Sequence, residues 1–130
     1  MADIAKAGNT SLASILLPAN HKHTGLYAGE ALAAGDLGYI KSDGKVWRST
    51  GAAANAAAVV DGMVAMPAAV GEACTLIFGC TVQYGSGLTP GAGYFLSATA
   101  GALADAASTG GTVVIARAID ATRIYIHKSY

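Results

Sequence analysis

The most metal-like spacing in this sequence is His21-Lys22-His23. In an extended segment the two imidazoles point to the same side of the chain, and His127 could supply a third nitrogen ligand. No acid or cysteine lies close to them in the sequence, and the ammonium of Lys22 would repel a cation. We therefore expect histidines that meet solvent or a partner, and no metal site.

The carboxylates show a second pattern, because five of the eight stand next to a glycine. These five are Glu30, Asp36, Asp43, Asp61 and Glu72. Asp and Gly serve the local backbone geometry of turns, whereas a catalytic carboxylate pair must converge on one cleft. We expect carboxylates with structural roles and no such pair.

Other catalytic signals are weak. The glycine-rich stretch 85–91 lacks the Lys-Ser/Thr of a phosphate-binding loop, and no Gly-x-Ser-x-Gly elbow occurs. Nothing near Cys74 or Cys80 would lower a thiol pKa. The sequence therefore predicts no catalytic residue, no cofactor site and no enzyme.

The two cysteines are expected to be free, buried thiols. If residues 74–80 form one strand, the Cα atoms of Cys74 and Cys80 lie about 20 Å apart, and a disulfide needs about 7 Å or less. Only a turn near Gly79 would bring them together. Free thiols and the lack of a signal peptide at the N-terminus predict a protein made in a reducing cytoplasm.

The aromatic side chains allow two interpretations. They could form a sugar-binding platform, but core packing and subunit contacts are the commoner use. The nine aromatic residues are Tyr27, Tyr39, Trp47, Phe78, Tyr84, Tyr94, Phe95, Tyr125 and Tyr130.

The amino-acid composition limits the kind of fold that can position these side chains. The chain has 130 residues and 12.9 kDa, enough for one domain, and it contains 29 alanines and 17 glycines. Eight basic and eight acidic side chains give no net charge, which disfavours a polyanion-binding protein. A mean hydropathy of +0.44 disfavours disorder. A monomer of this mass exposes about 6,300 Å², so we expect much of this weakly charged surface to be buried in an oligomer or larger assembly.

Residues 1–25 differ from the rest of the chain, because they show neither a hairpin signal nor a clean alternation of apolar residues. We predict an extended N-terminal arm that becomes ordered against a partner; the alternative is an edge strand folded onto the body. Its main apolar groups, and hence our candidate contacts, are Ile4, Ile15, Leu16 and Leu17.

Residues 26–130 are predicted to be a single β-rich body. Asp43-Gly44 predicts a type I′ hairpin turn, with Ile40 opposite Trp47 and Tyr39 opposite Arg48. Two further hairpins are expected about residues 100–101 and 120–122. Residues 51–58 form a loop or one helical turn.

The middle of the body is predicted to hold three more strands. Residues 59–65 form a strand with a bulge at the glycine, and residues 74–78 and 81–84 form a strand pair. Short strands at this spacing indicate an all-β class, a small antiparallel sandwich or barrel.

Several of these segments carry a family resemblance. They are Val60-Asp61-Gly62-Met63-Val64-Ala65, Thr75-Leu76-Ile77-Phe78-Gly79, Thr81-Val82-Gln83-Tyr84, and a loop with Leu88 and Pro90. Two further motifs, a Gly-Glu-x-Leu-x-x-Gly-Asp opening at 29–36 and a Leu-Ser…Ala-Gly-x-Leu hairpin at 96–103, resemble those of a broader set of small phage structural proteins. Over residues 28–127 the chain resembles the head decoration, or cement, proteins of tailed bacteriophages, including the lambda-type decoration protein. The segment from Gly91 to Tyr130 is longer than in the lambda-type proteins.

The resemblance implies a virion protein on the outer capsid surface, with a β-rich body that is usually a homotrimer. Its partner would be the major capsid protein, reached in part by the N-terminal arm, with no direct contact to nucleic acid or membrane. Each copy would clamp several coat subunits against the pressure of packed DNA. Two alternatives remain open: another phage structural module, such as a tail, fibre or glycan-binding surface protein, and a small enzyme with a deep polar pocket.

Overall fold

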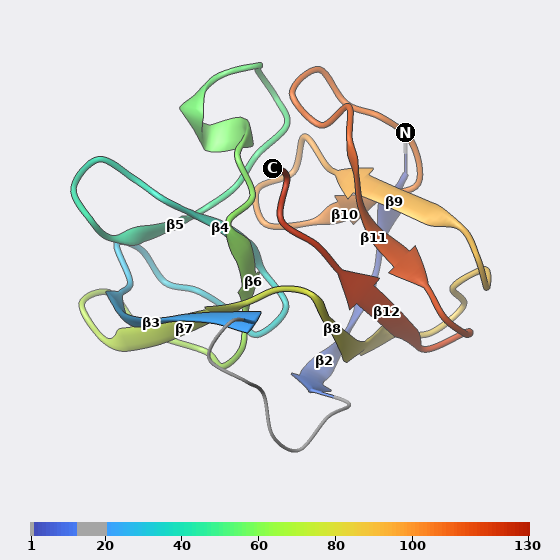
Figure 1. Cartoon of the computed structure of the whole chain (residues 1–130), viewed down its shortest axis with the longest axis horizontal. Helices are drawn as coiled ribbons and strands as arrows, with labels where there is room; N and C mark the ends of the chain where they lie inside the picture. The colour runs from blue at the N-terminus through green and yellow to red at the C-terminus, as the bar shows by residue number, and fades with distance from the viewer. Residues whose placement is uncertain (1, 13–20) are drawn as a thin grey trace.

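The computed structural model describes residues 2–12 and 21–130, with the backbone alone described at 7–12. These residues form strands arranged in two antiparallel sheets (Figure 1). The described part of the chain contains no α-helix, and none of its helical turns is long and apolar enough to cross a membrane. The predicted all-β class is confirmed.

The larger sheet has seven strands in the order β1-β10-β9-β11-β12-β8-β2. Their bounds are β1 Asp3–Ile4, β2 Lys6–Leu12, β8 Cys80–Gly85, β9 Gly93–Leu96, β10 Leu103–Ala104, β11 Val114–Ala118 and β12 Arg123–Ile126. The smaller sheet has the order β3-β7-β6-β4-β5. Its strands are β3 Lys22–Tyr27, β4 Leu37–Ile40, β5 Val46–Arg48, β6 Gly62–Val64 and β7 Ala73–Ile77. Between β5 and β6 the helical turn η2 covers Ala56–Ala58, within the predicted loop.

Two predicted hairpins are present. Strands β9 and β10 pair Leu96 with Leu103, and strands β11 and β12 pair Ala118 with Ile124. The tip of the second hairpin is held by Asp120, whose carboxylate accepts hydrogen bonds from the backbone and guanidinium groups that follow it. These bonds lower the pKa of Asp120 to about 2.

The hairpin at Asp43-Gly44 forms with a different turn and register from those predicted. Tyr39 pairs with Trp47 and Ile40 with Val46, one residue away from the expected pairing. Among the described residues only glycines have positive φ, so Asp43 does not adopt the left-handed conformation that a type I′ turn requires, whereas Gly44 has φ +80°. The loop is therefore one residue longer than a type I′ turn, with glycine alone taking the left-handed position.

The predicted strand pair of residues 74–78 and 81–84 is also wrong, because β7 and β8 lie in different sheets. The chain crosses between the sheets at Phe78-Gly79. Gly79 has φ +63°, its N–H donates to the Ile126 carbonyl at 2.6 Å, and a Cβ there would lie 2.8 Å from Nδ1 of His21. Glycine is needed at this crossing both for its φ and for its lack of a side chain.

No bulge marks Gly62, contrary to the prediction. Strand β6 pairs in continuous register with β4 and with β7. A Cβ at Gly62 would lie 2.8 Å from the Ile77 carbonyl oxygen, so the glycine permits close approach of two backbones.

The predicted arm needs a correction in its described part. Residues 3–12 form β1 and β2, which pair with β10 and β8 at the two opposite edges of the larger sheet, and residues 22–27 form β3. Only Ala5 separates β1 from β2, so one continuous segment closes the sheet on itself. The alternative of an edge strand folded on the body therefore describes these residues. At residues 2–6, whose side chains are described, the attachment is made largely by backbone and polar groups, which leave no alternating pattern.

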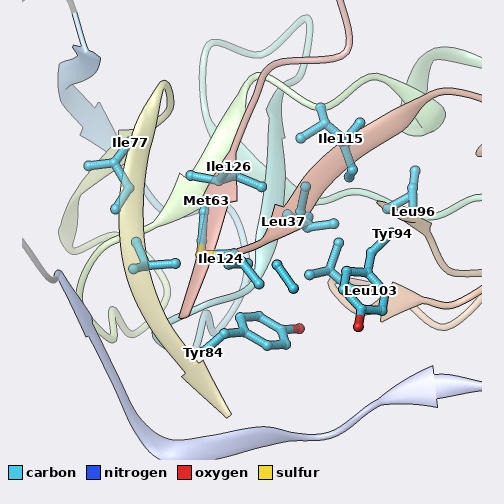
Figure 2. Packing of buried hydrophobic residues seen from close by; sticks show 14 of the residues in the cluster. Leu37, Met63, Ile77, Tyr84, Tyr94, Leu96, Leu103, Ile115, Ile124 and Ile126 are labelled. Atoms are coloured by element: carbon cyan, nitrogen blue, oxygen red, sulfur yellow. The ribbon is translucent and has the colours of Figure 1, made fainter. Parts of the chain in front are cut away.

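The main core joins the two sheets (Figure 2). Leu37, Met63 and Ile77 come from the smaller sheet and meet aromatic and aliphatic side chains of the larger one. Those from the larger sheet include Tyr84, Tyr94, Leu96, Leu103, Ile115, Ile124 and Ile126. A second cluster on the other face of the smaller sheet contains Ala28, Leu32, Val46, Val64, Ala68, Cys74 and Leu76.

The C-terminal residues 127–130 also connect the two sheets, and we call them the C-terminal clasp. Ser129 N–H donates to the Val60 carbonyl at 2.9 Å, and Val60 N–H donates to Oγ of Ser129 at 2.9 Å. The Tyr130 hydroxyl donates to Oδ1 of Asp61 at 2.5 Å, and Oδ2 of Asp61 accepts from Ile40 N–H at 2.8 Å. The bond to Asp61 and partial burial raise the pKa of Tyr130 to about 12.

Candidate functional site

Of the four candidate contact residues, the structure describes Ile4. It lies in β1 opposite Leu103, is half-buried, and packs against the main core of its own chain. Ile15, Leu16 and Leu17 lie outside the described residues. The four predicted contacts are thus not shown to form one surface, and Ile4 already contributes to the body.

Polar groups attach the N-terminal strand segment, residues 2–12. Ala2 N–H donates to Oδ1 of Asp105 at 3.0 Å, and Asp105 N–H donates back to the Ala2 carbonyl at 3.0 Å. The Asp3 carboxylate accepts a hydrogen bond from Oγ of Ser97. Hydrogen bonds from Ser97 and Thr99 lower the pKa of Asp3. Ser97 and Thr99 precede β10 and Asp105 follows it, which explains why β1 is held at this edge of the larger sheet.

Lys6 makes a further attachment, on the side of the smaller sheet. Its ammonium forms an ion pair with the carboxylate of Asp36, which is buried and also accepts Ala33 N–H at 2.9 Å. Asp36 belongs to the smaller sheet's side of the molecule, because the next residue begins β4. The ion pair therefore ties the N-terminal strand segment to both sheets. Removing one partner of a buried pair costs more than the pair contributes.

The carboxylates next to glycines have the structural roles predicted for them. Each accepts a backbone N–H at a turn or strand edge, with donors Arg48, Ala33, Lys45, Ile40 and Ala69 for Glu30, Asp36, Asp43, Asp61 and Glu72 in that order. Glu30 also binds the Arg48 guanidinium at 3.1 Å. These five carboxylates therefore hold turns and strand ends in place.

The three histidines lie along the seam where the sheets meet. The His23 ring lies 4.8 Å from the Phe78 ring, and the His127 ring 4.8 Å from that of Tyr125. The His21 ring lies beside Gly79, where the chain crosses between the sheets. Among residues 2–12 and 21–130, no three His, Cys, Asp or Glu side chains are grouped so that they could hold a metal ion. In this seam the imidazoles pack against rings and backbone.

Lys128 adds a cation to this seam. Its ammonium lies 4.6 Å from the Phe78 ring centre and 4.9 Å from that of Tyr130. Such cation–π contacts are favourable. Phe78 and Tyr130 are therefore engaged within the chain.

Cys74 and Cys80 are free and buried, as predicted, and they belong to different core clusters. Burial raises the pKa of both thiols, that of Cys80 to about 11. A protonated, enclosed thiol is a poor nucleophile, so both cysteines act as small core residues.

A shallow groove lies beside the turn of the β4–β5 hairpin. Its volume is about 270 Å³, and it is lined by Tyr39, Ile40, Lys41, Ser42, Ala56 and Val59. Ile40 and Val59 are each more than one-third exposed. With one ammonium, two hydroxyls and aliphatic walls, the groove suits an apolar side chain of another molecule better than a reacting group.

Large apolar side chains are also exposed away from this groove. Tyr27, Met66 and Val70 are 57%, 73% and 67% exposed on β3 and the loop after β6. Val113 and Val114 are exposed at the start of β11. From the sequence, Tyr27 was named only as one of nine aromatic residues and the other four were not singled out, because residue types alone do not show which side chains the fold leaves uncovered.

The sequence matches no protein-family model and no curated protein sequence. The described residues leave several large apolar side chains exposed, and the polar clusters described above hold the fold.

Proposed function

We propose that this chain is a structural virion protein that binds the outer surface of a phage capsid as a decoration, or cement, protein. The proposal rests on the resemblance over residues 28–127 and on one observation, which is the chemistry of the exposed surface. The chain exposes 6173 Å² with only sixteen Lys, Arg, Asp and Glu side chains, and its exposed large apolar side chains include Tyr27, Met66 and Val70. A patch of exposed apolar side chains marks an interaction site, and these three residues are the candidates for one.

The residues that carry the resemblance have structural roles here. Val60–Ala65 contains β6, and the next two segments hold β7 and β8, on either side of the crossing at Gly79. Asp36, at the end of the opening motif, holds Lys6. Such motifs support a shared scaffold, and the capsid-binding role is then assigned to the surface around it.

In this role the body would associate with copies of itself and span neighbouring coat subunits. The protein would be made in the host cytoplasm and act on the virion. Its action would be mechanical: coat subunits held by a common clamp must separate together, so outward pressure from packed DNA is opposed at each contact. Contacts to nucleic acid or membrane are not required.

The direct test adds purified protein to expanded capsids that lack decoration, followed by electron microscopy and a heat-rupture assay. We expect ordered density on the outer surface and a higher rupture temperature. The matched control is Met66→Asp/Val70→Asp, which changes exposed side chains only and should weaken binding without unfolding the body. Absence of binding, or density on the tail or fibre alone, would refute the capsid role.

A further inference from the structure

The strand edges leave little room for a second copy of the chain to pair through its backbone. In the larger sheet, the N-terminal strand segment occupies the outer sides of β8 and β10. In the smaller sheet, a parallel bridge joins Ala28 to Val46, and Gly29 N–H donates to the Val46 carbonyl at 2.8 Å, so β5 lies against the C-terminal end of β3. We therefore expect contacts between copies to use exposed side chains.

The groove beside the turn of the β4–β5 hairpin has a tyrosine hydroxyl without a partner. Tyr39 lines this groove and is only 8% exposed, and its hydroxyl makes no hydrogen bond within residues 2–12 and 21–130. A tyrosine buried to this extent usually has a hydrogen-bond partner for its hydroxyl. The oxygen is not enclosed, so water reaches it in the free chain, and an acceptor atom of a ligand could replace that water.

The other groups around the groove favour a ligand that is both aliphatic and anionic. Lys41 forms no ion pair in the described part of the chain; its ammonium lies over the Trp47 ring, 4.4 Å from the ring centre, and keeps its full charge. No acid is among the residues that line the groove. Ile40 and Val59 supply exposed aliphatic walls. The groove therefore suits an aliphatic side chain that stands close to a carboxylate.

The loop between β6 and β7, residues 65–72, carries this combination of groups. Val70 is 67% exposed, and Glu72 is exposed and forms no ion pair with any described residue. Oε1 of Glu72 accepts Ala69 N–H at 2.6 Å, which holds the carboxylate on the loop and leaves Oε2 for another donor. None of residues 65–72 lines the groove, so the groove of one chain would take the loop of another.

The two nearest alternatives among the described acids each lack one of these features. Asp120 follows Ile119, which is 44% exposed, but its carboxylate is already paired with the Arg123 guanidinium at 2.7 Å. Asp105 is exposed and forms no ion pair with a described residue, but it stands between two alanines. The β6–β7 loop is therefore the segment of this chain that matches the groove best.

We propose that the groove beside the β4–β5 turn binds the β6–β7 loop of a second copy of this chain, with Val70 between the aliphatic walls and Glu72 against Lys41 and the Tyr39 hydroxyl. Because the groove and the loop are different surfaces, each copy offers one of each, and the contact repeats around a ring until the last copy meets the first. A ring of three copies would agree with the resemblance. The inference concerns contacts between copies, and it holds whether or not the assembled protein binds a capsid.

The test is sedimentation velocity of the full chain over a dilution series, without capsids. Tyr39→Phe removes only the unpartnered hydroxyl, so it should leave the Tm unchanged and raise the dissociation constant about fivefold. Lys41→Glu brings like charges together and should raise the dissociation constant about tenfold. Lys45→Glu changes an exposed lysine of the same hairpin that does not line the groove, and as the charge-matched control it should leave association unchanged.

Variants of Glu72 test the other side of the contact. Glu72→Gln keeps an oxygen for Ala69 N–H and removes the charge, so it should raise the dissociation constant about threefold without loosening the loop. Glu72→Lys alone should weaken association as Lys41→Glu does. The double variant Lys41→Glu/Glu72→Lys places opposite charges together again and should restore the dissociation constant to near that of the parent chain.

Several results would overturn the proposal. They are a monomer at all concentrations, an oligomer that neither Tyr39→Phe nor Lys41→Glu weakens, and failure of the double variant to restore association. Hydrogen exchange gives a further check, because the amides of residues 40–42 and 69–72 should become protected together as the concentration rises. Protection of the groove that appears only when a different protein is added would show that another partner, and not a second copy, occupies it.

Discussion

Replacing Tyr130 by Phe tests the C-terminal clasp with the loss of one oxygen atom. The phenol donates to Oδ1 of Asp61 at 2.5 Å, and Asp61 is only 8% exposed. The substitution keeps the ring beside Lys128 and leaves Oδ2 of Asp61 bound to Ile40. Any change in stability therefore reports one hydrogen bond between the clasp and the smaller sheet.

The size of the effect follows from the exposure of the two partners. A hydrogen bond to a charged group contributes about 1.5–3 kcal/mol. Tyr130 is 72% exposed, so water can replace part of the lost bond, and we expect a loss of about 1–1.5 kcal/mol. For a chain of 130 residues this corresponds to a fall in Tm of roughly 4–6 °C.

The pH dependence of the difference gives a second measurement. The pKa of Tyr130 is raised to about 12 in the folded chain, against about 10 for an unfolded tyrosine. The bond therefore stabilises the fold fully below pH ~10 and is lost as the pH rises through ~12. Urea unfolding of parent and variant should differ at pH ~7 and converge near pH ~12, since the other titrating groups are common to both.

The control is Tyr125→Phe, which removes a hydroxyl that makes no hydrogen bond within the described residues. It should change the free energy of unfolding by less than ~0.5 kcal/mol. If Tyr130→Phe behaves like this control at neutral pH, or if its difference from the parent persists at pH ~12, the clasp is not held by this bond.

Three further predictions follow from the packing. Gly62→Ala should destabilise the fold by about 1–3 kcal/mol, because the new Cβ would meet a backbone carbonyl at 2.8 Å; urea unfolding measures this, and an unchanged midpoint would contradict it. Replacing both Cys74 and Cys80 by Ala should cost about 1–3 kcal/mol and leave association intact, and an unreduced parent mass two daltons light would show a disulfide instead. Lys6→Met should speed amide exchange in β1 and β2 much more than in β9, because it leaves Asp36 unpaired; uniform acceleration would indicate general destabilisation.

The parts of the fold that could be predicted are those set by neighbours in sequence. Glycine turns and alternating apolar residues located the hairpins β9–β10 and β11–β12. The turn at Gly44 was placed correctly, but its length was wrong, because Asp43-Gly44 is compatible with two loop lengths that differ by one residue. Local patterns therefore determine where a hairpin lies more reliably than its register.

The parts that could not be predicted depend on distant partners. Phe78-Gly79 resembles an ordinary turn, and only the positions of His21 and Ile126 make it a crossing between sheets. The Tyr130–Asp61 bond spans 69 residues and leaves no local pattern. Of the four candidate contacts the structure describes Ile4, and it packs against the core of its own chain.

The closing of the larger sheet by residues 2–12 also constrains the order of folding. Ala2 meets Asp105, 103 positions later, and β1 has no edge to join until β10 has been synthesised and paired with β9. Strand β1 precedes every other described strand in the chain, yet it is among the last to pair. Contacts so distant in sequence slow folding, and until they form, β8 and β10 each present an unpaired edge on which newly made chains can aggregate. Expression at lower temperature or with chaperones should for this reason raise the soluble yield more than any change to the core.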